Sequence, residues 1–240
     1  MFSTNNSNTK GKTAQELVTG SIEAPPRNAV LHGDCIDILG NFAHASVDFV
    51  LTDPPYLVRY ESRDGQRVRN DDNAAWLRPA FAQIYRVLKP ASYCVSFYGW
   101  NRVDRFVTAW NAAGFRIVGH LVFRKQYASG GKLLRYSHEC AYLLAKGNVM
   151  PPSKPIADVI DWKYTGNRLH PTQKPVNSLL PLVDTFCPAG GLVLDPFCGS
   201  GSTLVAARQL DRSYLGIEID PLHSVTARRR LAASTFHAVG

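Results

Sequence analysis

The sequence is poor in cysteine, and its few cysteines form no pattern. There are five, with no Cys-x-x-Cys pair among them: Cys35, Cys94, Cys140, Cys187 and Cys198. An odd and scattered set argues against a disulfide framework, so we expect a reduced, cytoplasmic setting. A structural zinc ion needs two matched ligand pairs, which the sequence lacks, and we therefore expect no metal.

Long apolar runs are also missing. No stretch approaches the roughly 18 apolar residues of a membrane helix, and the N-terminus lacks the charged-then-apolar layout of a signal peptide. The first residues are instead rich in Ser, Thr, Asn and Lys. We therefore expect a flexible N-terminal tail over 1–27, a single domain over 28–240, and no membrane partner.

Acidic residues are fewer than basic ones, 19 against 27, which gives a net charge of +8. Basic groups that bind phosphates release counterions, so this balance favours a nucleic-acid partner. A charge that only keeps the protein in solution explains the same number, and charge alone does not decide between the two.

Segments with the pattern of strands alternate with segments that have the pattern of helices. The expected strands are 29–32, 47–52, 93–98, 116–123, 140–145, 191–195 and 214–218. The expected helices are 36–42, 76–88, 102–113, 176–186, 202–210 and 221–233. This alternation predicts an α/β fold with a mostly parallel sheet, in which 116–123 and 140–145 pair antiparallel.

A glycine-rich turn follows the strand at 191–195 and reads Pro196-Phe197-Cys198-Gly199-Ser200-Gly201. Glycine lets the backbone approach a ligand closely, and the helix that follows offers free N–H groups, with Ser202 as its candidate cap. Glu218 ends the next strand, 19 residues after Gly199, where an acid binds ribose hydroxyls in folds of this kind. The turn is neither a Gly-x-Gly-x-x-Gly fingerprint nor a P-loop. A nucleoside cofactor of another class is expected.

The run Asp53-Pro54-Pro55-Tyr56 follows the buried strand at 47–52. Two prolines stiffen this loop, which then holds two acceptors, the Asp53 carboxylate and the Pro54 carbonyl. Two acceptors suit the two N–H groups of an aryl amine, and they stabilise charge that develops on its nitrogen. Tyr56 offers a face on which a base can stack. A plain Pro-Pro turn with a capping Asp is the alternative.

Together these motifs resemble the S-adenosylmethionine-dependent DNA amino-methyltransferases, and specifically their β group, in which the catalytic loop precedes the cofactor loop. The resemblance covers about residues 31–233. It implies S-adenosylmethionine as cofactor and catalytic roles for Asp53, Pro54, Pro55 and Tyr56. It implies cofactor binding by Asp34, Lys174, Asp195, Phe197, Gly199, Gly201, Ser202 and Glu218. Lys174 lies in the motif His170-Pro171-Thr172-Gln173-Lys174-Pro175, and we expect it to pair with the cofactor carboxylate.

The resemblance also implies a circularly permuted, Rossmann-like methyltransferase fold. The chain would enter at the third strand, the first two cofactor strands would come last, and the C-terminal helix would pack beside the start. The expected reaction is direct methyl transfer to adenine N6 of a base flipped out of double-stranded DNA. Asp at the first loop position is more typical of adenine enzymes in this family, and cytosine N4 is the alternative.

The DNA-binding region is expected in a small recognition insert at about 124–137 and 147–169. The loop 124–136 carries four cations and two tyrosines, and its expected DNA contacts are Arg124, Lys125, Lys132 and Arg135. A solvated hairpin end is the alternative for this loop. The segment 59–72 mixes four arginines with four acids and is either a lid over the target or disordered.

Other functions remain open at this point. The acceptor is RNA or a protein amide in one alternative, and in another the chain is a non-catalytic DNA-binding module. A nicotinamide oxidoreductase is disfavoured by the missing glycine fingerprint. The resemblance implies a bacterial or phage-encoded, nucleoid-associated protein and leaves a homodimer open.

Overall fold

The computed structural model describes residues 23–59, 65, 68–129, 133–162 and 173–233. Within these residues, one eight-stranded sheet has the order β1-β8-β7-β2-β3-β5-β4-β6. Its strands are β1 (Ala29–His32), β2 (Phe49–Thr52), β3 (Ser92–Phe97), β4 (Arg116–Ser129), β5 (Tyr136–Lys146), β6 (Val159–Trp162), β7 (Leu192–Asp195) and β8 (Ser213–Glu218). Strand β5 runs antiparallel to β3 and β4, and the other neighbouring pairs are parallel.

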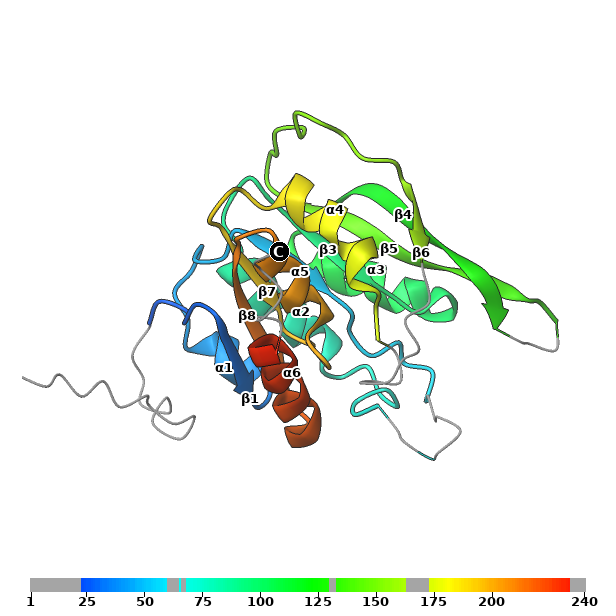
Figure 1. The fold of residues 1–240 in the computed structure, drawn as a ribbon, viewed down its shortest axis with the longest axis horizontal. Helices are drawn as coiled ribbons and strands as arrows, with labels where there is room; N and C mark the ends of the chain where they lie inside the picture. The colour runs from blue at the N-terminus through cyan, green and yellow to red at the C-terminus, as the bar shows by residue number, and fades with distance from the viewer. Residues whose placement is uncertain (1–22, 60–64, 66–67, 130–132, 163–172, 234–240) are drawn as a thin grey trace, which may run out of the picture.

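Helices cover both faces of this sheet (Figure 1). One face carries α1 (Cys35–Gly40), α2 (Leu77–Val87) and α3 (Val103–Ala113), and the other carries α4 (Val176–Phe186), α5 (Ser202–Gln209) and α6 (Pro221–Ala233). A short 3-10 helix, η2 (Trp100–Arg102), precedes α3. The expected α/β class and mostly parallel sheet are confirmed.

The strand order is that of a permuted chain. Strand β1 pairs with β8, and β7 lies between β8 and β2, so the last strands of the chain insert beside the first. Helix α6 packs against β1, where the Arg228 guanidinium donates to the Val30 carbonyl at 2.9 Å. The arrangement implied by the family resemblance is therefore confirmed.

Two helices match their predicted bounds to the residue, and one strand is new. Helices α4 and α6 span the expected residues, and α3 ends at the expected residue, Ala113, before Gly114 with φ 101°. Strand β6 was not predicted, because its four residues have no apolar alternation and it is held at the sheet edge by β4. Within the expected insert, 124–129 and 136–137 extend β4 and β5, and 159–162 form β6, so these parts continue the central sheet.

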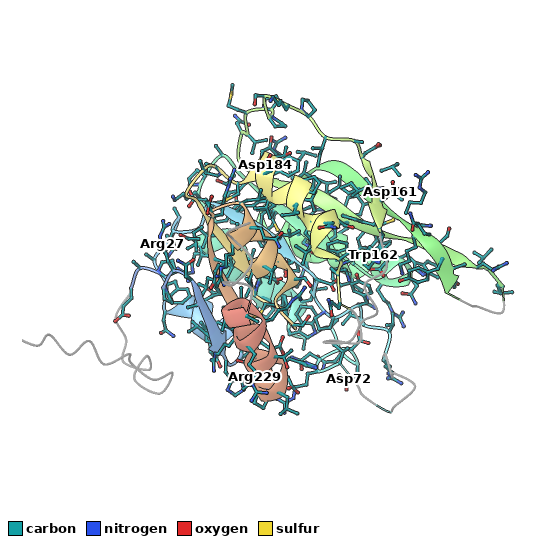
Figure 2. All side chains as sticks on the ribbon, viewed as in Figure 1. Arg27, Asp72, Asp161, Trp162, Asp184 and Arg229 are labelled. Atoms are coloured by element: carbon teal, nitrogen blue, oxygen red, sulfur yellow. The ribbon has the colours of Figure 1, made fainter. Side chains whose placement is uncertain are left out.

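The last residues of the expected tail lie against the domain. Glu23 exchanges backbone hydrogen bonds with Asn41 and Ala43. Arg27, labelled in Figure 2, donates to the Gly190 carbonyl at 3.0 Å. Residues 23–27 are thus part of the folded domain, while 1–22 lie outside the described residues.

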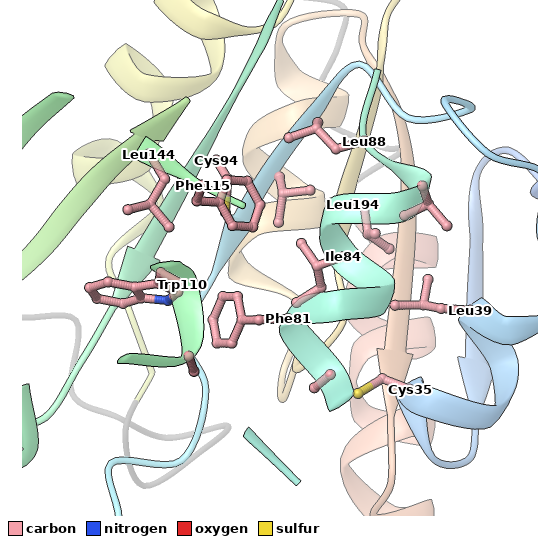
Figure 3. Close-up of a cluster of buried hydrophobic side chains, with 14 of the residues drawn as sticks. Cys35, Leu39, Phe81, Ile84, Leu88, Cys94, Trp110, Phe115, Leu144 and Leu194 are labelled. Carbon is pink, nitrogen blue, oxygen red and sulfur yellow. The ribbon is translucent and has the colours of Figure 1, made fainter. Parts of the chain in front are cut away.

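A cluster of buried apolar side chains lies between the sheet and helices α1, α2 and α3 (Figure 3). Phe81 of α2 meets Trp110 of α3 edge-on, with ring centroids 6.0 Å apart, and both side chains are fully buried. Ile84 and Leu194 belong to the same cluster. Burial of each such side chain stabilises the fold by about 1.5–3 kcal/mol, which holds the ends of β2 and β7 rigidly. Among the described residues, no helix is long and apolar enough to cross a membrane.

Candidate active site

One pocket is lined by both motif loops. The Asp53–Tyr56 loop follows β2 and the glycine loop follows β7, and these parallel neighbours end at the same edge of the sheet. Phe197, Gly199 and Glu218 line the same pocket as Asp53, Pro54, Pro55 and Tyr56. The carboxyl edge of a parallel sheet is the usual ligand site in open α/β folds. The two motifs, 142 residues apart in the sequence when counted from Asp53 to Asp195, therefore form one site.

Glycine, and not serine, is the capping residue before the helix that follows the cofactor loop. Gly201 is the N-cap residue of α5, with φ 79° in the left-handed region, and no side chain caps the helix. The predicted cap by Ser202 is therefore wrong. Ser202 is the first helical residue, and its hydroxyl accepts a hydrogen bond from the Arg230 guanidinium at 2.9 Å. Helix α6 thus holds the glycine loop from behind.

Glu218 ties the glycine loop to the next loop. Its carboxylate accepts the Gly199 N–H and the Asp220 N–H, each at 2.8 Å, and burial raises its pKa. Each oxygen keeps a second lone pair for a hydroxyl at the pocket. Asp34 also lines the pocket, and its carboxylate caps α1 by accepting the Ile36 N–H at 2.8 Å.

Asp195 is a buried acid at the pocket, and no described residue forms an ion pair with it. Its side chain accepts the Phe197 N–H at 3.1 Å, and burial raises its pKa to about 7. A cationic group in the pocket would favour the charged form of such a carboxyl. The amino group of S-adenosylmethionine is a cation of this kind, so these residues fit the cofactor.

The catalytic loop carries an ion pair that the sequence did not predict. Lys174 was expected to face the cofactor carboxylate, but its ammonium lies 2.5 Å from Asp53 Oδ2 and is almost fully buried. The Tyr56 hydroxyl donates to Asp53 Oδ1 at 2.7 Å. Burial raises the pKa of Asp53, and Lys174 opposes this rise. A partly enclosed carboxylate and ammonium attract each other strongly, which explains why Lys174 turns to Asp53.

Two further residues of this cluster differ from what the sequence predicted. Glu139 of β5 lies 3.2 Å from Lys174 and 2.7 Å from Lys125, and no motif had pointed to it. Lys125 was expected on the DNA-facing surface, but only 10% of its side chain is exposed. Successive strand residues point to opposite faces, so Lys125 follows the buried Phe123 inward while Arg124 points outward. Glu139 lies two residues before the buried Ala141 and so points to the same face of β5. An acid on a buried face was the sequence signal that could have indicated it.

The other expected DNA contacts are partly described. Arg124 is exposed and pairs with Asp161 at 2.8 Å, and Arg135 is exposed beyond the end of β4. Lys132 and residues 163–172 lie outside the described residues, including His170, Pro171 and Thr172 of the Lys174 motif. Within the segment 59–72, which was expected to be either a lid over the target or disordered, residues 68–71 line the pocket.

Comparisons with known proteins agree with this geometry. The family model N6_N4_Mtase, described as DNA methylase, matches residues 47–228. A protein of Escherichia coli (strain K12), putative methylase YubD, is 53% identical over 203 residues, which cover 85% of this chain and 89% of that protein. Type II methyltransferase M2.DpnII of Streptococcus pneumoniae is 26% identical over 247 residues, with the same coverage.

Two solved structures share the fold. The M1.HpyAVI complex with S-adenosylmethionine superposes with a TM-score of 0.67 at 22% identity, covering 84% of this chain and 98% of that one. PvuII DNA methyltransferase, described as cytosine-N4-specific, superposes with a TM-score of 0.72 at 15% identity. The match covers 88% of this chain and 89% of that one.

Proposed function

This chain belongs to the N6/N4 family of DNA methylases, and from that membership we propose that its acceptor is the N6 amino group of adenine. The coarser activity, S-adenosylmethionine-dependent methylation of DNA, follows from the family. The observation that supports adenine is Asp53 at the first position of a catalytic loop that shares its pocket with the glycine loop. The fold does not separate the two bases, since PvuII methyltransferase shares it.

The catalytic loop would bind the target amine. Asp53 and the Pro54 carbonyl accept its two hydrogens, which frees the nitrogen lone pair and stabilises positive charge there as it develops. The Tyr56 hydroxyl is held by Asp53, so its ring is fixed in the position where a flipped base would stack. When bound, S-adenosylmethionine supplies an activated methyl group on its sulfonium.

The remaining pocket residues would bind the cofactor. Glu218 would accept the ribose hydroxyls, Asp195 would face the amino group, and Asp34 would approach the adenine ring. The backbone of Phe197 to Gly201 would surround the methionine part, with Ser202 starting the helix behind it. On the outside, Arg124 and Arg135 are proposed phosphate contacts.

Analysis of the methylated base tests the proposal. We expect the purified full chain, supplied with methyl-labelled S-adenosylmethionine and duplex DNA, to yield N6-methyladenine as the labelled nucleoside after digestion. Labelled N4-methylcytosine would overturn the choice of base. Label in RNA or protein but not in DNA, or cofactor binding without transfer to any duplex, would contradict the activity itself.

Alanine at Gly99 is expected to slow methyl transfer about tenfold or more. A Cβ there would lie 2.7 Å from the Tyr56 carbonyl oxygen and 2.9 Å from Tyr56 Cβ, so the catalytic loop must shift. A misplacement of reacting groups by about 1 Å can lower the rate of a reaction by this factor or more. Single-turnover rates measure the effect, and Gly40→Ala is the control, because its added Cβ would meet nothing within 4 Å. Equal rates for the two variants would contradict the prediction.

A further inference from the structure

We propose that Glu139 is a positioning residue for methyl transfer, which keeps the surroundings of Asp53 from becoming positively charged. The inference rests on the proposed function, in which Asp53 accepts the hydrogens of the target amine. It assigns a task to a buried acid that lies outside both motif loops and was not predicted.

Five side chains from four segments meet at the catalytic loop. They are Asp53 and Tyr56 after β2, Lys125 on β4, Glu139 on β5 and Lys174 before α4. Glu139 bridges the two ammonium groups, with Lys125 at 2.7 Å on Oε1 and Lys174 at 3.2 Å on Oε2. The Tyr56 hydroxyl also lies 3.3 Å from Glu139 Oε2, so Glu139 touches every other segment of the cluster.

The charges of this cluster balance only when Glu139 is present. Asp53 and Glu139 carry two negative charges, and Lys125 and Lys174 carry two positive ones. Without the Glu139 charge, the cluster would hold two positive charges, on Lys125 and Lys174, against the single carboxylate of Asp53. The acceptor nitrogen gains positive charge as it takes up a methyl group, so an excess of positive charge beside it disfavours the transition state.

Burial prevents water from cancelling this effect. Only 6% of the Lys174 side chain and 23% of the Glu139 side chain are exposed, and the Lys174 ammonium lies 4.9 Å from the centre of the Phe97 ring. Charges in such surroundings are weakly screened. Burial raises the pKa of Glu139, but Lys174 and Lys125 more than offset this and hold it below its usual value, so the acid is charged.

The position of Glu139 explains how a lysine can lie beside Asp53 without abolishing its role as an acceptor. Lys174 alone would neutralise Asp53 and weaken it as an acceptor for the target amine. With Glu139 beside it, the ammonium is shared between two carboxylates, and Asp53 keeps part of its negative charge. The Asp53 carboxylate in turn helps to raise the pKa of Asp195, so these two acids interact. Lys174 thereby orients Asp53 without removing its charge.

A charge-matched pair of variants tests the inference. We expect Glu139→Gln to lower the single-turnover rate on DNA about tenfold or more, with cofactor affinity changed less than about twofold. The double variant Glu139→Gln, Lys125→Met restores the balance of charge and is expected to recover most of the rate. A residue that acts only by packing would give the double variant a rate no higher than that of the single one. Asp184→Asn on α4, which loses an exposed ion pair with Arg212 (3.3 Å), is the control.

A second measurement does not depend on activity. Carbon-13 NMR of labelled aspartate, without cofactor or DNA, gives the pKa of Asp53, whose signal is identified by its loss in Asp53→Asn. This pKa is expected to fall in Glu139→Gln and to rise again in the double variant, because Glu139 raises it and cations lower it.

The outcomes separate the two proposals. An unchanged Asp53 pKa, or an unchanged rate, in Glu139→Gln would overturn the role of Glu139. A wild-type protein that methylates no DNA would contradict the proposed function, while the NMR titration would still decide whether Glu139 sets the charge around Asp53.

Discussion

Alanine at position 53 is expected to lower the rate of methyl transfer to DNA by about a hundred- to a thousandfold. Asp53 is proposed to accept a hydrogen of the target amine and to stabilise the charge that develops on its nitrogen. Removal of one preorganised group that stabilises developing charge lowers the rate by about a hundred- to a thousandfold in other enzymes. Lys174 keeps Glu139 as its partner at 3.2 Å, so the variant retains a paired ammonium and is expected to fold.

Two measurements distinguish a chemical effect from a structural one. The single-turnover rate is expected to fall, whereas the dissociation constant of the cofactor, measured by calorimetry, is expected to change only a few-fold. Asp53→Asn provides a matched variant of the same size, and it is also expected to be slow, because its NH₂ group faces the hydrogens of the amine. Full activity of Asp53→Ala would remove the basis of the proposed mechanism.

Asparagine at position 195 is expected to change how stability depends on pH. Burial raises the pKa of the Asp195 carboxyl from 3.8 to about 7, so the folded protein favours its protonated form. The stability that this group contributes is fully present below pH 3.8 and is lost as the pH rises through about 7. One pKa unit corresponds to about 1.4 kcal/mol, so the loss approaches about 4 kcal/mol as an upper limit.

Denaturant unfolding from pH 4 to 8 measures this loss. The free energy of unfolding of the wild type, minus that of Asp195→Asn, is expected to fall over this range, because asparagine does not titrate. Asp104→Asn is the control, since Asp104 is exposed on α3. A difference that stays constant, or that grows with pH, would show that burial does not raise the pKa of Asp195. Bound cofactor is expected to reduce the slope, because a cation beside Asp195 favours its charged form.

Local patterns predicted those parts of the site that one segment determines. The starts of α4 and α6 follow from proline, since Pro175 is the N-cap residue of α4 and Pro221 is the first residue of α6. The meeting of the Asp53 loop and the glycine loop follows from two apolar strands that end before them, because parallel strands bring their carboxyl ends to one edge. These features need no knowledge of distant contacts.

The remaining parts depend on contacts between distant segments. The pairing of Lys174 with Asp53 joins residues 121 positions apart, and Lys125 meets Glu139 only because β4 and β5 pair in one particular register. The cap of α5 is another example, since Gly201 takes a left-handed conformation where an added Cβ would lie 3.2 Å from the Ala227 Cβ of α6. No local pattern carries this information.

The pairing of β1 with β8 has a consequence for synthesis of the chain on the ribosome. Strand β1 emerges first, but its partner, including Leu215 opposite Ala29, emerges last, 186 positions later. Contacts between such distant positions form slowly. Asp34, two residues after β1, therefore reaches its place at the pocket only once β8 has been made, and a nascent catalytic half has no finished cofactor site with which to act.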